Sequence, residues 1–409
     1  KITMGDGSVK FVEQNLLNTD LTLNLSQNIP WTGGSLFLET SAQRMDLFSE
    51  HKYSWQTSPI MIGYRQSLFG YNSLKWDKRI EPVRYQEAKK SYVETLELVS
   101  ANAINKFFAL ATAQSNYDIA SFNYANADTL YRYAQGRYNI GTITENEMLQ
   151  LELNRLTEET NRMNARIEMD NCMQELRSYL GIQEEREIRV RVSSRIPDFS
   201  INLNEALALA YENSPDIQTM KRRKLESESA VARARANAGL KADIYLRFGL
   251  TQTADKLPEA YRNLLDQQYV SLSISLPILD WGRGKGQVRV ARSNRDLVYT
   301  QVEQSRTDFE LNVRKLVKQF NLQTQRVRIA ARTDETAQRR NEVARKLYIL
   351  GKSTILDLNA SISEKDSARR NYVSALYNYW SLYYTLRSMT LYDFESNKLL
   401  TEDYNLLIE

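Results

Sequence analysis

The chain has 409 residues, of which 42% are apolar and 25% are charged, and its 54 Lys and Arg residues against 50 Asp and Glu residues leave a net charge of +4. This balance excludes the concentrated basic charge of nucleic-acid-binding proteins. There are 24 Tyr residues but only one His, His51, and one Cys, Cys172. Metal sites and most nucleophile or general-base groups use His or Cys, so we expect no enzyme, no metal site and no cofactor. No run of about 18 apolar residues exists, which excludes a transmembrane helix.

The side-chain pattern in the first part of the chain predicts β-strands. Residues 21–27, 35–41 and 60–69 alternate apolar and polar side chains with a period of two. Strands of about ten alternating residues also build membrane β-barrels, whose hydropathy signal is weak. The sequence therefore leaves a membrane barrel open.

The spacing of apolar residues changes to a helical period at Tyr92 and keeps steps of three and four up to Tyr131. This is a heptad seam of about 40 residues. It predicts one helix over about residues 74–138, which at 1.5 Å per residue is a rod on the order of 100 Å long. A compact globule has no need of such a helix.

The stretch RYNIGTIT ends this helix, and LYILGKST, 210 residues later, keeps its Tyr, Gly and Thr in the same places. Gly reaches positive φ at little cost and commonly caps a helix, so each stretch predicts a chain reversal. Thr144 and Thr354 then cap the returning helices, with Glu147 and Asp357 in the first turns. Both stretches are predicted to be tips of helical hairpins.

The offset of 210 also aligns other positions, such as Lys75 with Lys285 and Arg79 with Arg289. An insertion would rotate an apolar stripe by 100° per residue, so one unbroken offset indicates a duplicated pair of long helices. We expect a first repeat at residues 1–200 with its tip at 138–144. A second repeat follows at residues 201–395 with its tip at 348–354, and residues 396–409 form a tail.

The second repeat opens with a predicted helix over about residues 203–240, before strands at 242–252 and 269–279. Subtracting 210 places the counterpart of this helix over a few positions ahead of Lys1 and about the first 30 residues, but residues 1–20 do not supply a helical pattern. The opening KITMGDGSVK is not a signal peptide. We expect the gene to encode an N-terminal helix and a signal peptide ahead of Lys1.

The returning helix of the second repeat alternates small and large side chains from Ala368 through Tyr372, Ala375 and Tyr379. Such alternation suits a ring of helices with unequal neighbour spacing. An ordinary antiparallel bundle explains this stripe equally well.

These motifs resemble those of TolC-type outer-membrane efflux channels, whose repeats carry Tyr-x-x-Gly followed by Thr and an acid at each hairpin tip. Residues 138–141 and 348–351 match that pattern. The strand-to-helix stretch SLPILDWGRGKGQ and the stretch LNEALALAYENSPDIQTMKRRKLE match as well. The resemblance covers nearly the whole chain from about Leu21.

The resemblance implies a mainly α protein with a membrane β-barrel part. Long coiled-coil hairpins would form an α-barrel tunnel, and each protomer would give four or so strands to a twelve-stranded barrel shared by a homotrimer. Aromatic residues near the strand ends are candidates for interface girdles. They are Trp31, Trp55, Tyr71, Trp76, Tyr269 and Trp281.

The implied function is that of an exit duct in the outer membrane of a Gram-negative bacterium, with the helical tunnel in the periplasm. It would serve a tripartite efflux or type I secretion system. The implied partners are a periplasmic adaptor (membrane fusion) protein, an inner-membrane RND or ABC transporter and outer-membrane lipid, with no nucleic acid. The cargo stays open between drugs, metals and proteins.

The resemblance also implies roles for the tips. Residues expected to dock the adaptor are Tyr138, Ile140, Gly141, Thr142, Leu350, Gly351 and Lys352. Residues expected at the periplasmic gate are Tyr348, Asp357, Thr144 and Glu147. Three copies of Asp357 on a threefold axis would form an acidic ring that favours cations.

The chain departs from the family pattern at two gate positions. Ala360 replaces a second acid, and Ser353, beside Lys352, replaces a basic residue. A double acidic ring is therefore not expected. The alternative function is a soluble coiled-coil scaffold, which explains the heptads but not the paired strands. GRGKG at residues 282–286 lacks the spacing of a phosphate-binding loop.

Overall fold

The computed structural model describes residues 2–3, 9–10, 15–48, 51–184, 186–193, 195–350 and 352–400. The chain forms two compact units, each built from two separate stretches. One unit, which we call the sheet unit, comprises residues 1–85 and 218–304. The other, the hairpin unit, comprises residues 86–217 and 305–409.

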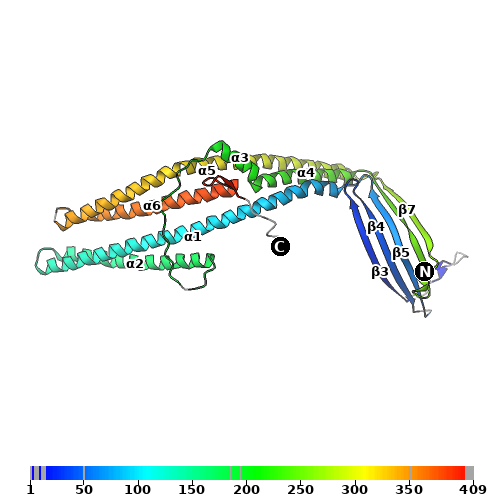
Figure 1. Ribbon diagram of the computed structural model, residues 1–409, viewed down its shortest axis with the longest axis horizontal. Helices are drawn as coiled ribbons and strands as arrows, with labels where there is room; N and C mark the ends of the chain where they lie inside the picture. The colour runs from blue at the N-terminus through cyan, green and yellow to red at the C-terminus, as the bar shows by residue number, and fades with distance from the viewer. Residues whose placement is uncertain are drawn as a thin grey trace. The chain divides into compact units, whose positions relative to one another are not determined.

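The sheet unit contains a five-stranded antiparallel sheet in the order β3-β4-β5-β6-β7 (Figure 1). The strands are β3 (Leu16–Ile29), β4 (Gly34–Leu47), β5 (Lys52–Ser67), β6 (Lys241–Ala254) and β7 (Leu265–Ser275). Each segment predicted to be a strand lies mainly in one of these strands, but the last, predicted to reach residue 279, ends at Ser275. The sheet has five strands, against the four or so implied by the resemblance. A short separate hairpin joins β1 (Ile2–Thr3) to β2 (Val9–Lys10), and a 3-10 turn, η1 (Glu259–Tyr261), lies between β6 and β7.

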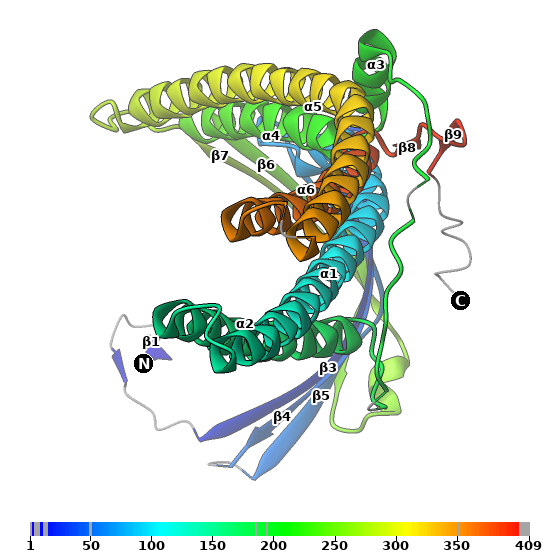
Figure 2. The ribbon, with the colours of Figure 1, turned by 90° about the vertical axis from the view of Figure 1, so that its left-hand side faces the viewer.

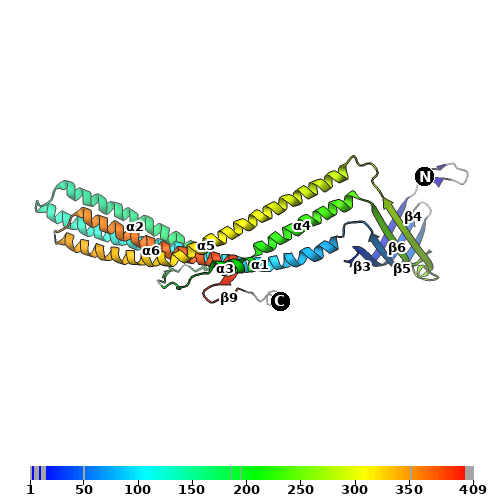
Figure 3. The ribbon, with the colours of Figure 1, turned by 90° about the horizontal axis from the view of Figure 1, so that it is seen from above.

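Three helices begin or end in the sheet unit. Helix α4 (Pro215–Ala238) lies between the first parts of α1 (Ser73–Asn139) and α5 (Arg283–Ile349), as Figure 3 shows. Glu228 of α4 accepts a hydrogen bond of 2.6 Å from the Tyr299 hydroxyl of α5. The same carboxylate lies 3.8 Å from the Arg79 guanidinium of α1. One side chain of α4 thus links both neighbouring helices.

The hairpin unit contains two helical hairpins (Figure 2). Helix α1 returns as α2 (Glu145–Tyr179), and α5 returns as α6 (Ile355–Thr390). Helices α1 and α5 have 67 residues each, and both their first and their last residues are 210 apart. The predicted long helices and the constant offset are confirmed. Among the described helices, none has an 18-residue segment apolar enough to cross a membrane.

The helix expected over residues 203–240 is in fact two helices, α3 (Leu203–Asn213) and α4. Ser214 separates them, with extended backbone at φ −62° and ψ 136°. Pro215 explains the break, because its ring disfavours helical backbone at the preceding residue and it has no N–H to donate. The prediction of a single helix was wrong because it left out the effect of Pro215 on the backbone of the preceding residue.

One part of the core of the hairpin unit is an aromatic cluster between α5, α6 and the segment before α3, and another is formed by Leu110 and Ala113 of α1 with Met169 and Leu176 of α2. Phe320 stacks at 5.2 Å from Tyr379 and at 5.3 Å from Phe199, measured between ring centroids. The Tyr379 hydroxyl donates a hydrogen bond of 2.9 Å to the Pro197 carbonyl oxygen. Burial of Tyr379 is complete, so its polar end needs this partner. The extended segment is thereby fixed across both helices.

An ion pair joins the two hairpins near the end of α6. The Arg387 guanidinium lies 2.9 Å and 3.0 Å from the two carboxylate oxygens of Glu97 in α1. It also lies 3.5 Å from Asp393, after α6. The side chains of Arg387 and Glu97 are only 16% and 11% exposed, so each charge depends on the other for compensation.

Replacing Arg387 by Met should destabilise the fold by about 3 kcal/mol, because it leaves the Glu97 carboxylate buried without its cation. The added change Glu97→Gln should recover part of this loss. The measurement is denaturant unfolding of the detergent-solubilised protein. Arg332→Met removes an exposed pair with Glu335 and should cost under about 1 kcal/mol. Equal losses of unfolding free energy in Arg387→Met and Arg332→Met would contradict the assignment of Arg387 and Glu97 as a buried, mutually dependent ion pair.

Candidate functional site

The first hairpin tip follows the last turn of α1. The Thr142 N–H donates a hydrogen bond of 2.9 Å to the Arg137 carbonyl oxygen, and the Gly141 N–H donates one of 2.8 Å to Tyr138. Gly141 has φ +73°, the left-handed conformation that L side chains rarely adopt. No neighbouring atom lies within 4 Å of a Cβ built at this position. The Gly is therefore needed for the backbone turn and not for internal packing.

The second tip repeats the same backbone bond 210 residues later. The Lys352 N–H donates a hydrogen bond of 2.9 Å to the Leu347 carbonyl oxygen. The Leu350 N–H donates one of 3.1 Å to Lys346. Gly351, predicted to be the pivot of this turn, lies outside the described residues. The bond from Lys352 to Leu347 is the equivalent of the bond from Thr142 to Arg137 at the first tip.

Each returning helix starts with a capping box, as the sequence predicted. At α2 the Thr144 hydroxyl accepts from the Glu147 N–H at 3.3 Å, and the Glu147 carboxylate accepts from the Thr144 N–H at 2.9 Å. At α6 the corresponding distances between Thr354 and Asp357 are both 3.2 Å. These reciprocal bonds satisfy N–H groups that have no partner within the helix.

The Asp357 carboxylate is the more heavily bonded of the two acids. It accepts hydrogen bonds from the Thr354 hydroxyl at 2.6 Å and from the Ser353 hydroxyl at 3.2 Å, besides the Thr354 N–H. These bonds, led by that of the Thr354 hydroxyl, hold the pKa of Asp357 below its usual value. Ser353, noted as a departure from the family pattern, therefore supports the acid directly.

The tips expose apolar side chains to solvent. Ile140 is 73% exposed at the first tip, and Leu350 is 67% exposed at the second. Leu356, in the first turn of α6, is 75% exposed and was not singled out from the sequence. Tyr138 is exposed, whereas Tyr348 is half-buried. Exposed apolar groups at the end of a hairpin are typical of a surface that contacts another protein.

The predicted gate residues do not form one cluster within a single chain. Thr144 bonds to Glu147, and Thr354 bonds to Asp357. Among the described residues, no hydrogen bond or ion pair joins one tip to the other. Nor does the described part of the chain hold a group of three His, Cys, Asp or Glu side chains that could bind a metal ion.

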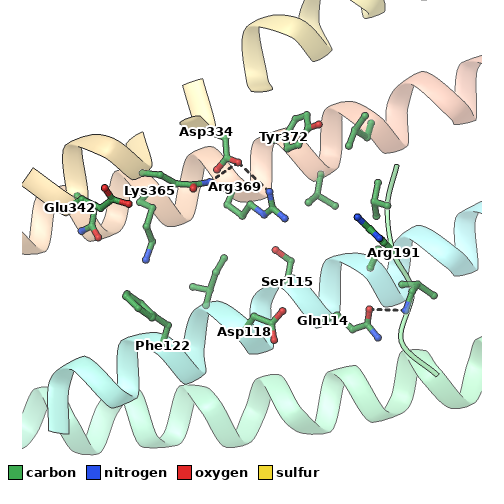
Figure 4. Close-up of a pocket in the computed structure, with 18 residues that line it drawn as sticks. Gln114, Ser115, Asp118, Phe122, Arg191, Asp334, Glu342, Lys365, Arg369 and Tyr372 are labelled. Carbon is green, nitrogen blue, oxygen red and sulfur yellow. Dashed lines mark hydrogen bonds and ion pairs between the residues drawn. The ribbon is translucent and has the colours of Figure 1, made fainter. Parts of the chain in front are cut away.

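A polar cluster that the sequence analysis missed lies between the two hairpins, beside a cavity of about 670 Å³ whose lining includes Phe122, Asp334, Lys365 and Arg369 (Figure 4). The Asn123 side chain of α1 donates a hydrogen bond of 2.7 Å to Asp366 of α6, which is buried. The neighbouring Lys365 ammonium lies 4.3 Å from the centre of the Phe122 ring. Arg369 of α6 lies 3.2 Å from the buried Asp334 carboxylate of α5.

This cluster was missed because its partners are far apart in the sequence. Asn123 and Asp366 are separated by 243 residues. The local sequence around one of them does not indicate that the other is its partner. The signal that could have found it is a pair of polar residues on the inner faces of two predicted hairpins. The hydrogen bond from Asn123 to Asp366 favours one register of the seam between α1 and α6, since a shift of either helix would break it, whereas Lys365, 3.3 Å from Asp366, would stay beside the acid.

Comparison with known families supports the resemblance drawn from the motifs. Residues 206–390 match the model of the outer membrane efflux protein family. The chain is 21% identical to Outer membrane protein TolC of Escherichia coli, over 73% of this chain. It spans 61% of the length of that protein.

Solved structures extend the similarity over almost the whole chain. The outer membrane channel CmeC of Campylobacter jejuni gives a TM-score of 0.67 at 14% identity, covering 97% of this chain and 80% of that one. The open state of the MtrE outer membrane channel of Neisseria gonorrhoeae gives 0.65 at 12% identity, covering 96% and 82%. The expected resemblance to TolC-type channels, in sequence and in fold, is confirmed.

Replacing Thr354 by Ala should weaken the first turn of α6 by about 1 kcal/mol, because the Asp357 N–H loses its acceptor. Amide hydrogen exchange at residues 356–359 measures this directly. Thr354→Ser keeps a hydroxyl and should exchange like the parent. Thr144→Ala is the matched change at the other tip and should speed exchange only at the start of α2. Unchanged exchange in Thr354→Ala would show that the Thr354 hydroxyl does not stabilise the first turn of α6.

Proposed function

We propose that this chain is a subunit of an outer-membrane channel that serves as the exit duct of a tripartite efflux or type I secretion system. The observation that carries the proposal is the pairing of a TolC-type fold with two equivalent, apolar hairpin tips. The channel would lie in the outer membrane of a Gram-negative bacterium, with its helices in the periplasm. It would have no catalytic role.

The assembly would be a homotrimer in which the sheets of three copies close into one barrel. Among the described strands of a single copy, the outer edges of β3 and β7 have no partner. Unpaired backbone groups cannot remain in lipid, because no water is present there to bond to them. Ring closure between copies satisfies these groups, and outer-membrane lipid would cover the outside. The alternative, a soluble scaffold, leaves the exposed apolar strands without a purpose.

We assign the two hairpins to two repeats. The first would comprise residues 1–200, with its tip at 138–144, and the second residues 201–395, with its tip at 348–354. Residues 396–409 would be a tail. The equal lengths of α1 and α5 support this division, since both tips then end a helix of the same size.

The tips would dock a periplasmic adaptor protein that connects the channel to an inner-membrane transporter of the RND or ABC type. At the first tip, Ile140 and Thr142 flank Gly141, where the space around the α-carbon is open. A helix of the adaptor can therefore approach the backbone closely. Leu350, Gly351 and Lys352 would have the equivalent role at the second tip, and Tyr138 would border the first.

The adaptor contact is testable by photo-crosslinking in the native organism. A photoreactive amino acid at Ile140 or Leu350 should yield a product that mass spectrometry identifies as the periplasmic adaptor. The same probe at Leu257, which is exposed in the sheet unit, is the control and should yield no such product. Adaptor products from Leu257 but from neither tip would contradict the docking assignment.

The gate would be lined by Tyr348 and Asp357 of the second repeat and by Thr144 and Glu147 of the first. A lowered pKa keeps Asp357 ionised in the single chain. Three copies around the trimer axis would place three negative charges at the mouth, which attract cations and repel one another.

Asp357→Asn should therefore reduce the preference for cations in planar bilayers, measured as the reversal potential under a salt gradient. The amide still accepts a hydrogen bond from Thr354, so the cap is largely kept. Glu147→Gln tests the proposed gate acid of the other tip by the same measurement. Unchanged selectivity in Asp357→Asn would remove this residue from the gate.

A further inference from the structure

Strand β3 is a full member of the sheet. All 14 of its residues pair with β4, from Leu16 with Leu47 to Ile29 with Gly34, and no bulge interrupts the register. On one face the Asn24 side chain donates a long hydrogen bond of 3.4 Å to the Glu39 carboxylate of β4. A strand with so continuous a ladder cannot leave the sheet without exposing the backbone groups of β4.

The second repeat has no counterpart of β3. Strands β4 and β5 precede α1 in the same order as β6 and β7 precede α5. An offset of 210 places the residues of β3 opposite α4, which is helical. This strand is therefore an addition to the duplicated pattern of two strands before each long helix.

One face of the sheet carries an apolar line that includes β3. The register aligns Leu25 of β3 with Leu38 of β4, then Ile62 of β5 and Phe248 of β6. These four side chains are 62%, 40%, 49% and 47% exposed, respectively. On β3 itself, Leu21 and Leu23 extend the apolar row and are 78% and 62% exposed. Leu25 is thus in register with apolar neighbours, and among the described residues nothing covers the row.

On β3 itself the opposite face is polar. Thr22, Asn24 and Ser26 alternate with the three leucines of β3. They lie on the face of Arg65 and Tyr245, whose guanidinium and ring stack at 5.5 Å. On β4 and β5 the same face also carries the buried side chains of Phe37 and Met61. An apolar outer face and a polar inner face are the pattern of a strand that separates lipid from a water-filled lumen. A strand pairing at the edge of a soluble sheet has no need for such an apolar row.

We propose that β3 is a membrane strand with Leu21, Leu23 and Leu25 facing lipid hydrocarbon, so that each copy gives at least five strands to the barrel and a trimer at least fifteen. The inference rests on the proposed function and enlarges the barrel beyond twelve strands. The 14 residues of β3 are more than the 9 to 11 or so that a tilted strand needs to cross the hydrocarbon.

The direction of β3 sets a condition on the ring. Four antiparallel pairings separate β3 from β7, so the two edge strands run in the same direction. A seam made directly by β3 and the next copy's β7 is a parallel ladder, only slightly less stable per residue than an antiparallel one. One more strand between them would make every pairing antiparallel. Both closures keep β3 paired with β4, whereas a twelve-stranded ring requires β4 to exchange β3 for the next copy's β7.

A cysteine scan of β3 tests its membrane position. In a background of Cys172→Ala, single Cys residues at positions 21–26 are treated with a water-soluble maleimide in intact outer membranes. We expect labelling at positions 22, 24 and 26 from the lumen and loss of labelling at positions 21, 23 and 25. Labelling at all six positions would overturn the proposal. The channel conductance of each variant is measured in parallel. Variants that conduct but are labelled at all six positions would contradict the membrane position of β3 alone, whereas loss of conductance would point to a failure of the proposed channel function.

Cross-linking tests the pairing of β4 in the assembled protein. Thr22 and Ser41 are opposite each other, so the double variant Thr22→Cys, Ser41→Cys should form a disulfide within one chain. The competing arrangement predicts links between chains from Ser41→Cys to a Cys placed at Ser271, Ser273 or Ser275 of β7. Chain-to-chain links of that kind, without the link inside one chain, would show that β3 is displaced on assembly.

Discussion

A long helix cannot gain or lose a residue without turning its apolar stripe by about 100°, and this constraint governs the hairpin unit. Helices α1 and α5 have kept the same length, and their ends are the same 210 residues apart. Each must end where its apolar stripe still faces the returning helix. The caps at Thr144 and Thr354 complete this arrangement, because they fix the residue at which the return begins. Equivalent tips are therefore a consequence of helix packing.

Polar contacts inside the seam add specificity to this packing. Heptad stripes of Ala, Leu and Tyr tolerate sliding by one heptad, since similar side chains recur. The pairs Asn123 with Asp366 and Glu97 with Arg387 do not, because a shifted helix would break the first hydrogen bond and would leave Glu97 buried without its cation. Both pairs connect the first hairpin to the second. They fix the register between two hairpins whose apolar stripes are similar.

Local sequence was sufficient to predict the helices, the tips and the caps. Gly141 and the pair Thr354 and Asp357 act through neighbours only a few residues away, so their spacing carries the information. The break at Ser214 was also local and could have been predicted from Pro215. The pairing of Asn123 with Asp366 could not, because it depends on how two distant hairpins pack. The same holds for the sheet, where alternation identified the strands but not that β3 pairs with β4 along its whole length.

The central claim is that copies of this chain close into a membrane channel. Its most direct test is the mass and single-channel conductance of the full-length protein, solubilised by detergent from outer-membrane fractions. The account predicts a trimer that inserts into planar bilayers and conducts ions in discrete steps. A water-soluble monomer or dimer that does not conduct would contradict it and would favour a coiled-coil scaffold.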